Sequence, residues 1–304
     1  MKAWLPLVVV ASLLAGNCAR PVPLEEDAAT ASLGEPERFY TPRGPIEMVV
    51  GLFNPGPATL RIGRGIVDGT HLELRDAHGK RLDPHPMSDP APDPGLIAPG
   101  QRVQFRVELL SLFPASSQPG DYTLTVVYPR FRSNTIALKV LPAFRADADY
   151  RADVVTDRGT ITLKFFPDIA PNHVKNFINL SRAGFYDNIL FHRIVRGMAI
   201  QSGDPTRTGR GGPGYTLRAE FSDRPQKRGT LSMAREGSDP NSAGSQWFIC
   251  VDRVPEWDGK YTVFGEVVSG MEVVDAISRV RVKKEVPQES VVLKRIIIRE
   301  RNRR

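Results

Sequence analysis

The chain has 304 residues, 41% of them hydrophobic, and a formal net charge of +7 at pH 7. This length exceeds one average domain and suits two domains with additional ends, and the apolar content is ample for packed cores. The composition therefore predicts a globular protein and excludes an intrinsically disordered one.

The first 17 residues have the pattern of an export signal. A basic start at Lys2 is followed by an apolar run from Trp4 to Leu14, then by small residues and Cys18. The run is too short to span a bilayer comfortably, which takes about 20 apolar residues. The ending "LLAGNC" resembles a bacterial lipobox, which implies lipidation of Cys18 and a membrane anchor; ordinary signal-peptidase cleavage is the alternative. We expect an exported protein of the bacterial cell envelope, on its periplasmic side or outer surface.

The positive charge is spread along the chain, apart from the C-terminal run "KRIIIRERNRR". Basic runs can bind nucleic acid or anionic lipid. Because an exported protein seldom meets nucleic acid, we expect no nucleic-acid partner. We interpret the run as a solvated tail, with surface contact as the alternative.

Residues 18–37 lack periodic apolar positions and predict a flexible tether. Residues 38–142 alternate strand-like runs such as "IEMVVGLFN" and "DYTLTVVYP" with turns such as "NPGP" and "QPGD". Short strands at this spacing predict an antiparallel β-sandwich of immunoglobulin type. The stretch "PGDYTLTV" resembles the tyrosine corner of such sandwiches at Tyr122. The cysteine pair of antibody domains is absent, so the resemblance concerns the architecture alone.

Residues 143–149 are predicted to be a linker, and residues 150–304 a second domain. A hairpin is expected around residues 157–159, a helix from about Pro171 to Ala183, and a second helix over residues 270–280. Four further runs, "GTLSMA", "SQWFICV", "TVFGEVV" and "VVLKRIIIRE", are strand-like. This pattern predicts a mainly β fold, a closed β-barrel capped by two helices.

Several common chemistries are absent from the sequence. There is no P-loop, no H-E-x-x-H, no C-x-x-C and no G-x-S-x-G motif. His71, His78 and His85 are scattered over a strand, a turn and a loop, so we expect no metal site. We expect no cofactor either. What remains is Arg193, between apolar residues and a Gly-rich polar turn, with no acid, base or metal ligand nearby.

Five ordered stretches of residues 150–300 resemble the cyclophilins, the peptidyl-prolyl cis/trans isomerases. They are "APNHVKNFINLSRAGFYDNILFHRIV", "QSGDPTRTGRGGPGYTLRAEF", "RGTLSMAR", "GSQWFIC" and "DGKYTVFGEV". The resemblance implies a cyclophilin-like barrel and isomerase activity on proline-containing segments, here those of exported proteins.

The resemblance also implies roles for individual residues. Arg193 would be the catalytic arginine and Gln201 a catalytic partner that grips the substrate backbone. His192 would be a core residue beside the site. The substrate-binding positions implied are Met198, Ala234, Arg235, Gln246, Phe248, Trp257 and Tyr261.

A lone arginine is a sufficient catalyst for this reaction. Isomerisation breaks no bond, and its barrier arises from amide resonance. A guanidinium can donate a hydrogen bond to the prolyl nitrogen as that atom becomes pyramidal, and it stays charged throughout.

The sequence departs from the family pattern at five residues. Met198 and Ala199 stand where Phe-Met is usual, and Ser202 replaces a common glycine and is expected to crowd its turn. Trp257 takes a usual leucine position. Glu256 takes the place of the tryptophan that helps animal cyclophilins bind cyclosporin, so we expect weak cyclosporin binding.

Two alternatives to a folding isomerase stay open. The C-terminal domain could be a catalytically weak module that binds proline segments and is recruited through the sandwich. Alternatively, the sandwich could be an adhesin or docking domain, with the isomerase secondary.

Overall fold

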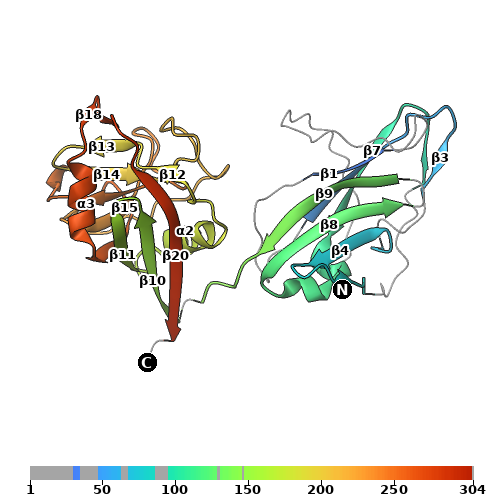
Figure 1. Ribbon diagram of the computed structural model, residues 1–304, viewed down its shortest axis with the longest axis horizontal. Coiled ribbons are helices and arrows are strands. Elements are labelled where there is room, and N and C mark those ends of the chain that lie inside the picture. The colour runs from blue at the N-terminus through green and yellow to red at the C-terminus, as the bar shows by residue number, and fades with distance from the viewer. Residues whose placement is uncertain are drawn as a thin grey trace. The chain divides into compact units, whose positions relative to one another are not determined.

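The computed structural model describes residues 30–34, 47–62, 68–85, 95–128, 131–145 and 147–302 (Figure 1). The predicted signal, residues 1–17, and Cys18 lie outside the described residues. The chain divides into two compact units, Met1–Ala143 and Phe144–Arg304. No helix in the described ranges is long and apolar enough to cross a membrane.

The N-terminal unit contains two main antiparallel sheets. The first has the order β1-β2-β7, and the second β5-β4-β8-β9, with a small β3-β6 pair beside them. Their bounds are β1 Thr30–Gly34, β2 Glu47–Phe53, β3 Leu60–Arg61, β4 Leu72–Asp76, β5 Arg81–Leu82, β6 Leu96–Ile97, β7 Arg102–Glu108, β8 Gly120–Tyr128 and β9 Phe131–Val140. A short helix α1 (Leu109–Leu112) and a 3-10 turn η2 (Pro114–Ser117) precede β8.

One hydrophobic cluster unites the two sheets. Leu52 of β2, Leu74 of β4 and Leu124 of β8 are all fully buried in it. The Tyr122 hydroxyl donates to the carbonyl oxygen of Gln118 at 2.8 Å, the backward bond that a tyrosine corner makes. The immunoglobulin-type topology itself stays a prediction.

The tether predicted over residues 18–37 differs from the structure at its end. Residues 30–34 form β1 and pair antiparallel with β2, from Thr30 opposite Phe53 to Gly34 opposite Val49. Without β1, strand β2 would be an edge strand with unpaired backbone groups, which explains why a nearby polar segment is recruited to it.

The C-terminal unit is built on one nine-stranded sheet of order β12-β20-β10-β11-β17-β15-β16-β14-β13. Its strands are β10 Ala148–Thr156, β11 Gly159–Phe165, β12 Ile189–Leu190, β13 Arg193–Val195, β14 Ala199–Ser202, β15 Thr230–Met233, β16 Trp247–Cys250, β17 Val263–Ser269 and β20 Val292–Asn302. A separate hairpin pairs β18 (Val282–Lys283) with β19 (Val286–Pro287). Since β10 begins at Ala148, the last two residues of the predicted linker 143–149 belong to that strand.

The predicted closed barrel is corrected to an open half-barrel. The two edge strands, β12 and β13, follow each other in the chain, and among the described strands no ladder joins them. They are two and three residues long, too short to complete a ladder across the last gap. Ser202 of β14 partly spans that gap, because its hydroxyl donates to the carbonyl oxygen of Leu190 at 2.9 Å. Ser202, expected to crowd its turn, instead makes this bond while fully buried.

Two helices lie on opposite sides of these strands (Figure 1). The first is confirmed as α2 (Pro171–Arg182), with Pro171 at its start, where a missing N–H costs nothing. Its predicted apolar face, including Val174 and Phe177, is fully buried. The second is α3 (Met271–Ser278). A 3-10 turn, η3 (Pro255–Trp257), precedes β17.

Candidate active site

Three neighbouring strands bring the predicted site residues into one row. Arg193 of β13 lies opposite Gln201 of β14, and Gln201 lies opposite Phe248 of β16. Directly opposed residues of antiparallel strands point to the same face, so the three side chains emerge together. Gln246 precedes β16 by one residue.

The polar side chains of this row are joined by hydrogen bonds. Nη1 of Arg193 donates to Oε1 of Gln201 at 3.2 Å, and Nε2 of Gln201 donates to Oε1 of Gln246 at 2.9 Å. Nε2 of Gln246 donates in turn to the carbonyl oxygens of Gly209 at 3.0 Å and Gly211 at 2.9 Å. We call this the polar row. Each amide is held in one orientation by its two neighbours, so the side chains of the row are already oriented before a substrate binds.

Glu285 completes the polar row at the arginine end. Its Oε2 accepts from Nε of Arg193 at 2.7 Å, and its carbonyl oxygen accepts from the backbone N–H of Ile194 at 2.8 Å. Lys284 and Glu285 form the tip of the β18–β19 hairpin, and both have positive φ, 51° and 64°. No sequence signal pointed to Glu285, because residues other than Gly, Asn and Asp are uncommon in such a turn.

An apolar cluster lies beside the polar row. Ala199, Phe248 and Cys250 are buried in it, and Ala234, Trp257 and Tyr261 pack against them. The rings of Phe248, Trp257 and Tyr261 are in mutual contact, with centroids between 5.2 and 5.6 Å apart. Since the last two rings are only partly buried, the cluster offers aromatic surface to a ligand.

Two of the departures from the family pattern meet in this cluster. Ala199 is smaller than the usual methionine, and Trp257 is larger than the usual leucine. Because both belong to the same cluster, we infer that Trp257 fills volume that the small Ala199 side chain leaves. Met198 lies in the turn between β13 and β14, half-buried and outside the cluster. Ala199 is thus the member of the pair that lies in the cluster, and the substrate-binding role of Met198 stays a prediction.

Arg235 is committed to structural contacts. Its Nε donates to the carbonyl oxygen of Lys260 at 2.8 Å, and its Nη1 to those of Glu236 and Gly237 at 2.8 and 3.0 Å. Its guanidinium lies 5.1 Å from the centroid of the Tyr261 ring. Three backbone carbonyl groups and the Tyr261 ring thus fix Arg235, and its predicted substrate-binding role stays a prediction.

The loop after β14 fixes the carbonyl groups that end the polar row. Asp204 is fully buried, and its carboxylate accepts from the backbone N–H and hydroxyl of Thr206, both at 2.7 Å, and from the N–H of Gly209. Burial alone would raise the pKa of Asp204, but these hydrogen bonds outweigh it and lower the pKa. Gly203, with φ 96°, lets the loop pass where a Cβ would collide with the backbone of Ser245 and Gln246.

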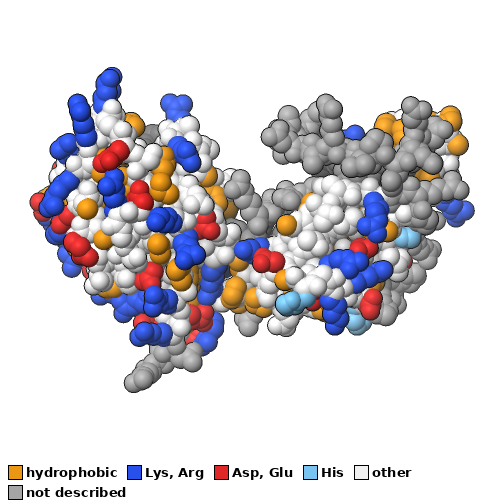
Figure 2. Space-filling model, in the orientation of Figure 1, with side chains coloured by type: hydrophobic (Ala, Val, Ile, Leu, Met, Phe, Trp, Pro, Cys, Tyr) orange, Lys and Arg blue, Asp and Glu red, His pale blue; other side chains and the backbone are white. Residues whose placement is uncertain are grey.

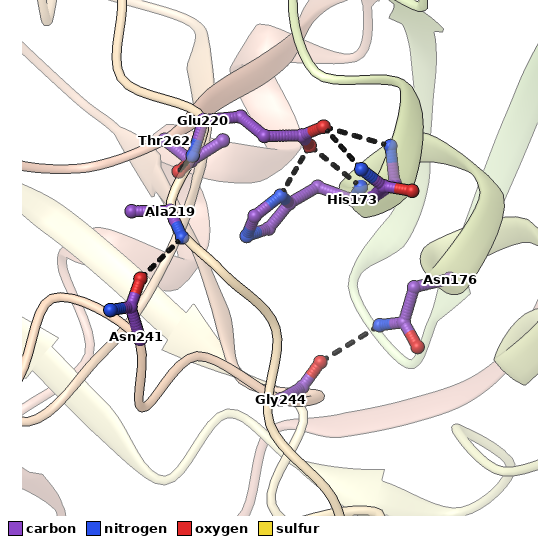
Figure 3. Close-up of polar contacts among 8 residues, drawn as sticks. His173, Asn176, Ala219, Glu220, Asn241, Gly244 and Thr262 are labelled. Atoms are coloured by element: carbon purple, nitrogen blue, oxygen red, sulfur yellow. Dashed lines mark hydrogen bonds and ion pairs between the residues drawn. The ribbon is translucent and has the colours of Figure 1, made fainter.

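Helix α2 binds two segments near the site: its N-terminus binds Glu220, and Asn176, further along the helix, binds Gly244 (Figure 3). The Glu220 carboxylate accepts from the N–H groups of Asn172 and His173 at 3.1 and 3.0 Å, which are free because Ala170 provides no side-chain cap. Nδ1 of His173 donates to the same carboxylate at 2.6 Å. Asn176 donates from Nδ2 to the carbonyl oxygen of Gly244 at 2.8 Å, two residues before Gln246.

Two titratable side chains beside the row, His192 and Cys250, have shifted pKa values. Burial lowers the pKa of His192, although Asp204 and Gln246 oppose the shift. Burial also raises the pKa of the Cys250 thiol to about 12, so that thiol is protonated and no nucleophile. The arrangement can donate hydrogen bonds to a peptide and bind an apolar ring, without forming or breaking a bond.

Comparison with known proteins decides the family. A family model described as cyclophilin type peptidyl-prolyl cis-trans isomerase matches residues 151–298. A peptidyl-prolyl cis-trans isomerase of Synechococcus elongatus is 49% identical over 116 residues, which cover 38% of this chain and 79% of the relative. The chain belongs to the cyclophilin family. Its C-terminal unit is a peptidyl-prolyl cis/trans isomerase.

Further relatives match the same C-terminal part of the chain. Peptidyl-prolyl cis-trans isomerase B of Bacillus subtilis is 42% identical over 138 residues, 45% of this chain and 95% of the relative. A crystal structure of a Cryptosporidium parvum cyclophilin type isomerase is 34% identical and covers 50% of this chain and 98% of its own, with a TM-score of 0.48. The family model begins at residue 151, so it leaves the N-terminal unit uncovered.

Proposed function

We propose that the cyclophilin unit accelerates X-Pro isomerisation through a hydrogen bond from Arg193 to the prolyl nitrogen. The observation that supports this is that the nitrogen atoms of its guanidinium have different hydrogen-bond partners. Nε is bound to Glu285 and Nη1 to Gln201, while no described residue accepts from Nη2. The side chain is 46% exposed, so that donor is accessible to a substrate.

This arrangement can supply the reduction in activation free energy that the reaction requires. The uncatalysed barrier is about 18 to 20 kcal/mol. Turnover at roughly 10 to 1000 per second requires its reduction by about 4 to 7 kcal/mol. A charge-assisted hydrogen bond contributes about 1.5 to 3 kcal/mol, and more where water is excluded. The remainder falls to binding of the proline ring and of the flanking backbone.

The two other parts of the site fit those roles. The aromatic surface of Phe248, Trp257 and Tyr261 suits a proline ring, which is apolar and compact. Gln201 has one amide N–H left after its bond to Gln246, and it points from the same face as Arg193. That N–H is suited to a carbonyl group of the substrate backbone.

A binding module with weak turnover is the second candidate. The observation that favours it is the Glu285 carboxylate, which binds the same guanidinium that a substrate needs. Two measurements separate the candidates. A protease-coupled assay on an Ala-Pro peptide compares the native protein with Arg193→Ala, and Arg196→Ala is a control that removes an exposed arginine from the same hairpin. The isomerase proposal expects a large loss only in Arg193→Ala; equal, negligible rates in native protein and Arg193→Ala would favour the binder.

We further propose that the protein assists the folding of exported proteins from a lipid anchor at Cys18. The sequence pattern of residues 1–18 supports this. The N-terminal unit would then recruit partners, and an adhesin or docking role for it is the alternative. Mass spectrometry of the mature N-terminus tests the anchor, since a diacylglyceryl-modified Cys18 is expected and an unmodified terminus would contradict it.

A further inference from the structure

Four unpaired basic residues stand at the two ends of the polar row. At one end is the tip of the β18–β19 hairpin, which is bonded to β13 through Glu285. At the other end is the 207–210 segment, whose neighbouring carbonyl groups bind Gln246. The four residues, which we call the basic rim, are Arg207, Arg210, Lys283 and Lys284.

All members of the basic rim are exposed, and within the described part of the chain no Asp or Glu forms an ion pair with any of them. The nearest acidic side chain in each of the two segments already has other partners. Glu285 is bound to Arg193, and Asp204 is buried in hydrogen bonds with its own loop. Figure 2 shows Lys and Arg side chains projecting from the end of this unit at which Figure 1 places β18. The field along the polar row is therefore positive.

The loop beside the apolar cluster, which follows Ala234, has no such excess of basic residues. The loop that follows Ala234 carries Arg235, which is turned toward carbonyl groups, together with the acidic residues Glu236 and Asp239. An extended peptide advances about 3.3 Å per residue, and lysine and arginine side chains reach several ångströms from the backbone. Residues one to three positions from the bound proline thus come within range of the basic rim.

We propose that this cyclophilin prefers X-Pro bonds flanked by aspartate or glutamate, and that the basic rim is the cause. The inference rests on the proposed function, because it assigns a substrate class to the same site. A peptide is favoured over a lipid surface because the rim brackets the row that would hold a peptide backbone. Charges of this kind act mainly on association, so the preference weakens as salt screens them.

The test uses the full-length protein and three proline peptides that differ only at the flanking positions, which are Glu, Gln or Lys. NMR exchange measures isomerisation without a coupling protease, whose own charge preference would interfere. At low salt, about 20 mM, kcat/KM for the Glu peptide is expected to exceed that for the Gln peptide by about 3- to 10-fold, with the Lys peptide lowest. At about 300 mM salt the ratio is expected to approach one.

Two variants with equal net charge assign the effect. The rim variant is Arg207→Asn, Arg210→Gln, Lys283→Gln and Lys284→Asn, with Asn at the two positions of positive φ, which it tolerates. The control variant removes four exposed basic residues of α2 and β20, Lys175→Gln, Lys294→Gln, Arg295→Gln and Arg301→Gln. The ratio of kcat/KM for the Glu peptide to that for the Gln peptide is expected to fall to about one in the rim variant and to stay near the native ratio in the control variant.

A ratio of one in the native protein at low salt would overturn the proposal, as would a ratio that survives in the rim variant or is lost equally in the control. The native protein could instead sediment with phosphatidylserine vesicles, the rim variant fail to do so, and the peptide ratio be one. That result would show that the basic rim binds membranes rather than acidic peptides. No acceleration of the neutral Gln peptide would be a failure of the isomerase function itself, which separates the two hypotheses.

Discussion

The guanidinium of Arg193 is held by the carboxylate of Glu285, a residue 92 positions further along the chain. The two side chains are 46% and 45% exposed, and Nε of Arg193 lies 2.7 Å from Oε2 of Glu285. This contact occupies the side of the guanidinium nearest its own backbone. On the far side, Nη1 donates to Gln201, and no described residue accepts from Nη2.

Glu285→Asn is expected to lower kcat on a neutral Ala-Pro peptide by up to about fivefold, because an exposed ion pair contributes about 0 to 1 kcal/mol. Asn keeps the positive φ of the turn but is too short to reach Arg193. Glu285→Gln, which keeps an acceptor oxygen, is expected to remain closer to the native rate. Steady-state kinetics with separate kcat and KM measure this. A faster Glu285→Asn enzyme would show that the carboxylate competes with substrate.

Ala199→Met is expected to destabilise the cyclophilin unit by about 1 to 3 kcal/mol, because it overpacks the cluster that Trp257 already fills. Trp257→Leu alone is expected to cost about 1 to 2 kcal/mol through lost packing. The double variant should be more stable than the sum of the two changes allows, with a coupling of at least about 0.5 kcal/mol. Urea unfolding measures all three free energies. Simple additivity would contradict the compensation.

Acid is expected to destabilise the cyclophilin unit in two steps. Burial lowers the pKa of His173 below its ordinary value of 6.5, although its bond to Glu220 opposes the shift. The unfolded state therefore binds more protons below pH 6.5, and stability falls as pH drops through that range. For Glu220, burial acts to raise the pKa, but hydrogen bonds from His173 and Asn172 outweigh it and lower the pKa below 4.5. Its contribution is present above pH 4.5 and is lost as pH falls further.

Thermal unfolding followed by the fluorescence of Trp247 and Trp257 measures this, and NMR titration of the His173 ring checks the first step directly. Glu220→Gln is expected to remove the lower step, because the amide has no proton to gain. A melting temperature that stays constant from neutral pH down to about pH 5 would contradict the assignment of the first step.

Cyclosporin is expected to bind this cyclophilin weakly. Glu256 is exposed in η3 and occupies the place of the tryptophan that helps animal relatives bind the drug. A carboxylate cannot replace the apolar contact of an indole ring. Glu256→Trp is expected to tighten binding at least about tenfold in a competition assay, which corresponds to about 1.4 kcal/mol. Nanomolar inhibition of the native enzyme would contradict this prediction.

Local sequence patterns were sufficient for much of the cyclophilin unit. Helix α2 follows from Pro171 and the spacing of its apolar residues, and the motifs that contain Arg193, Gln201 and Phe248 lie on three neighbouring strands. These features depend on residues close together in the chain, where periodicity and family motifs can be compared directly.

The rest was decided by contacts between distant segments. Among the described strands, the edge strands β12 and β13 do not pair with each other and so leave an open half-barrel, since sequence alternation predicts strands but not whether the last two meet. The pairing of residues 30–34 with β2 depends on a free strand edge, which no local pattern announces. Glu285 reaches Arg193 only because a hairpin turn adopts positive φ at two residues that rarely do so. The sequence by itself indicated which residues are candidates for the site, whereas the tertiary structure decided which of their hydrogen-bond donors find partners, because that depends on segments far away in the chain.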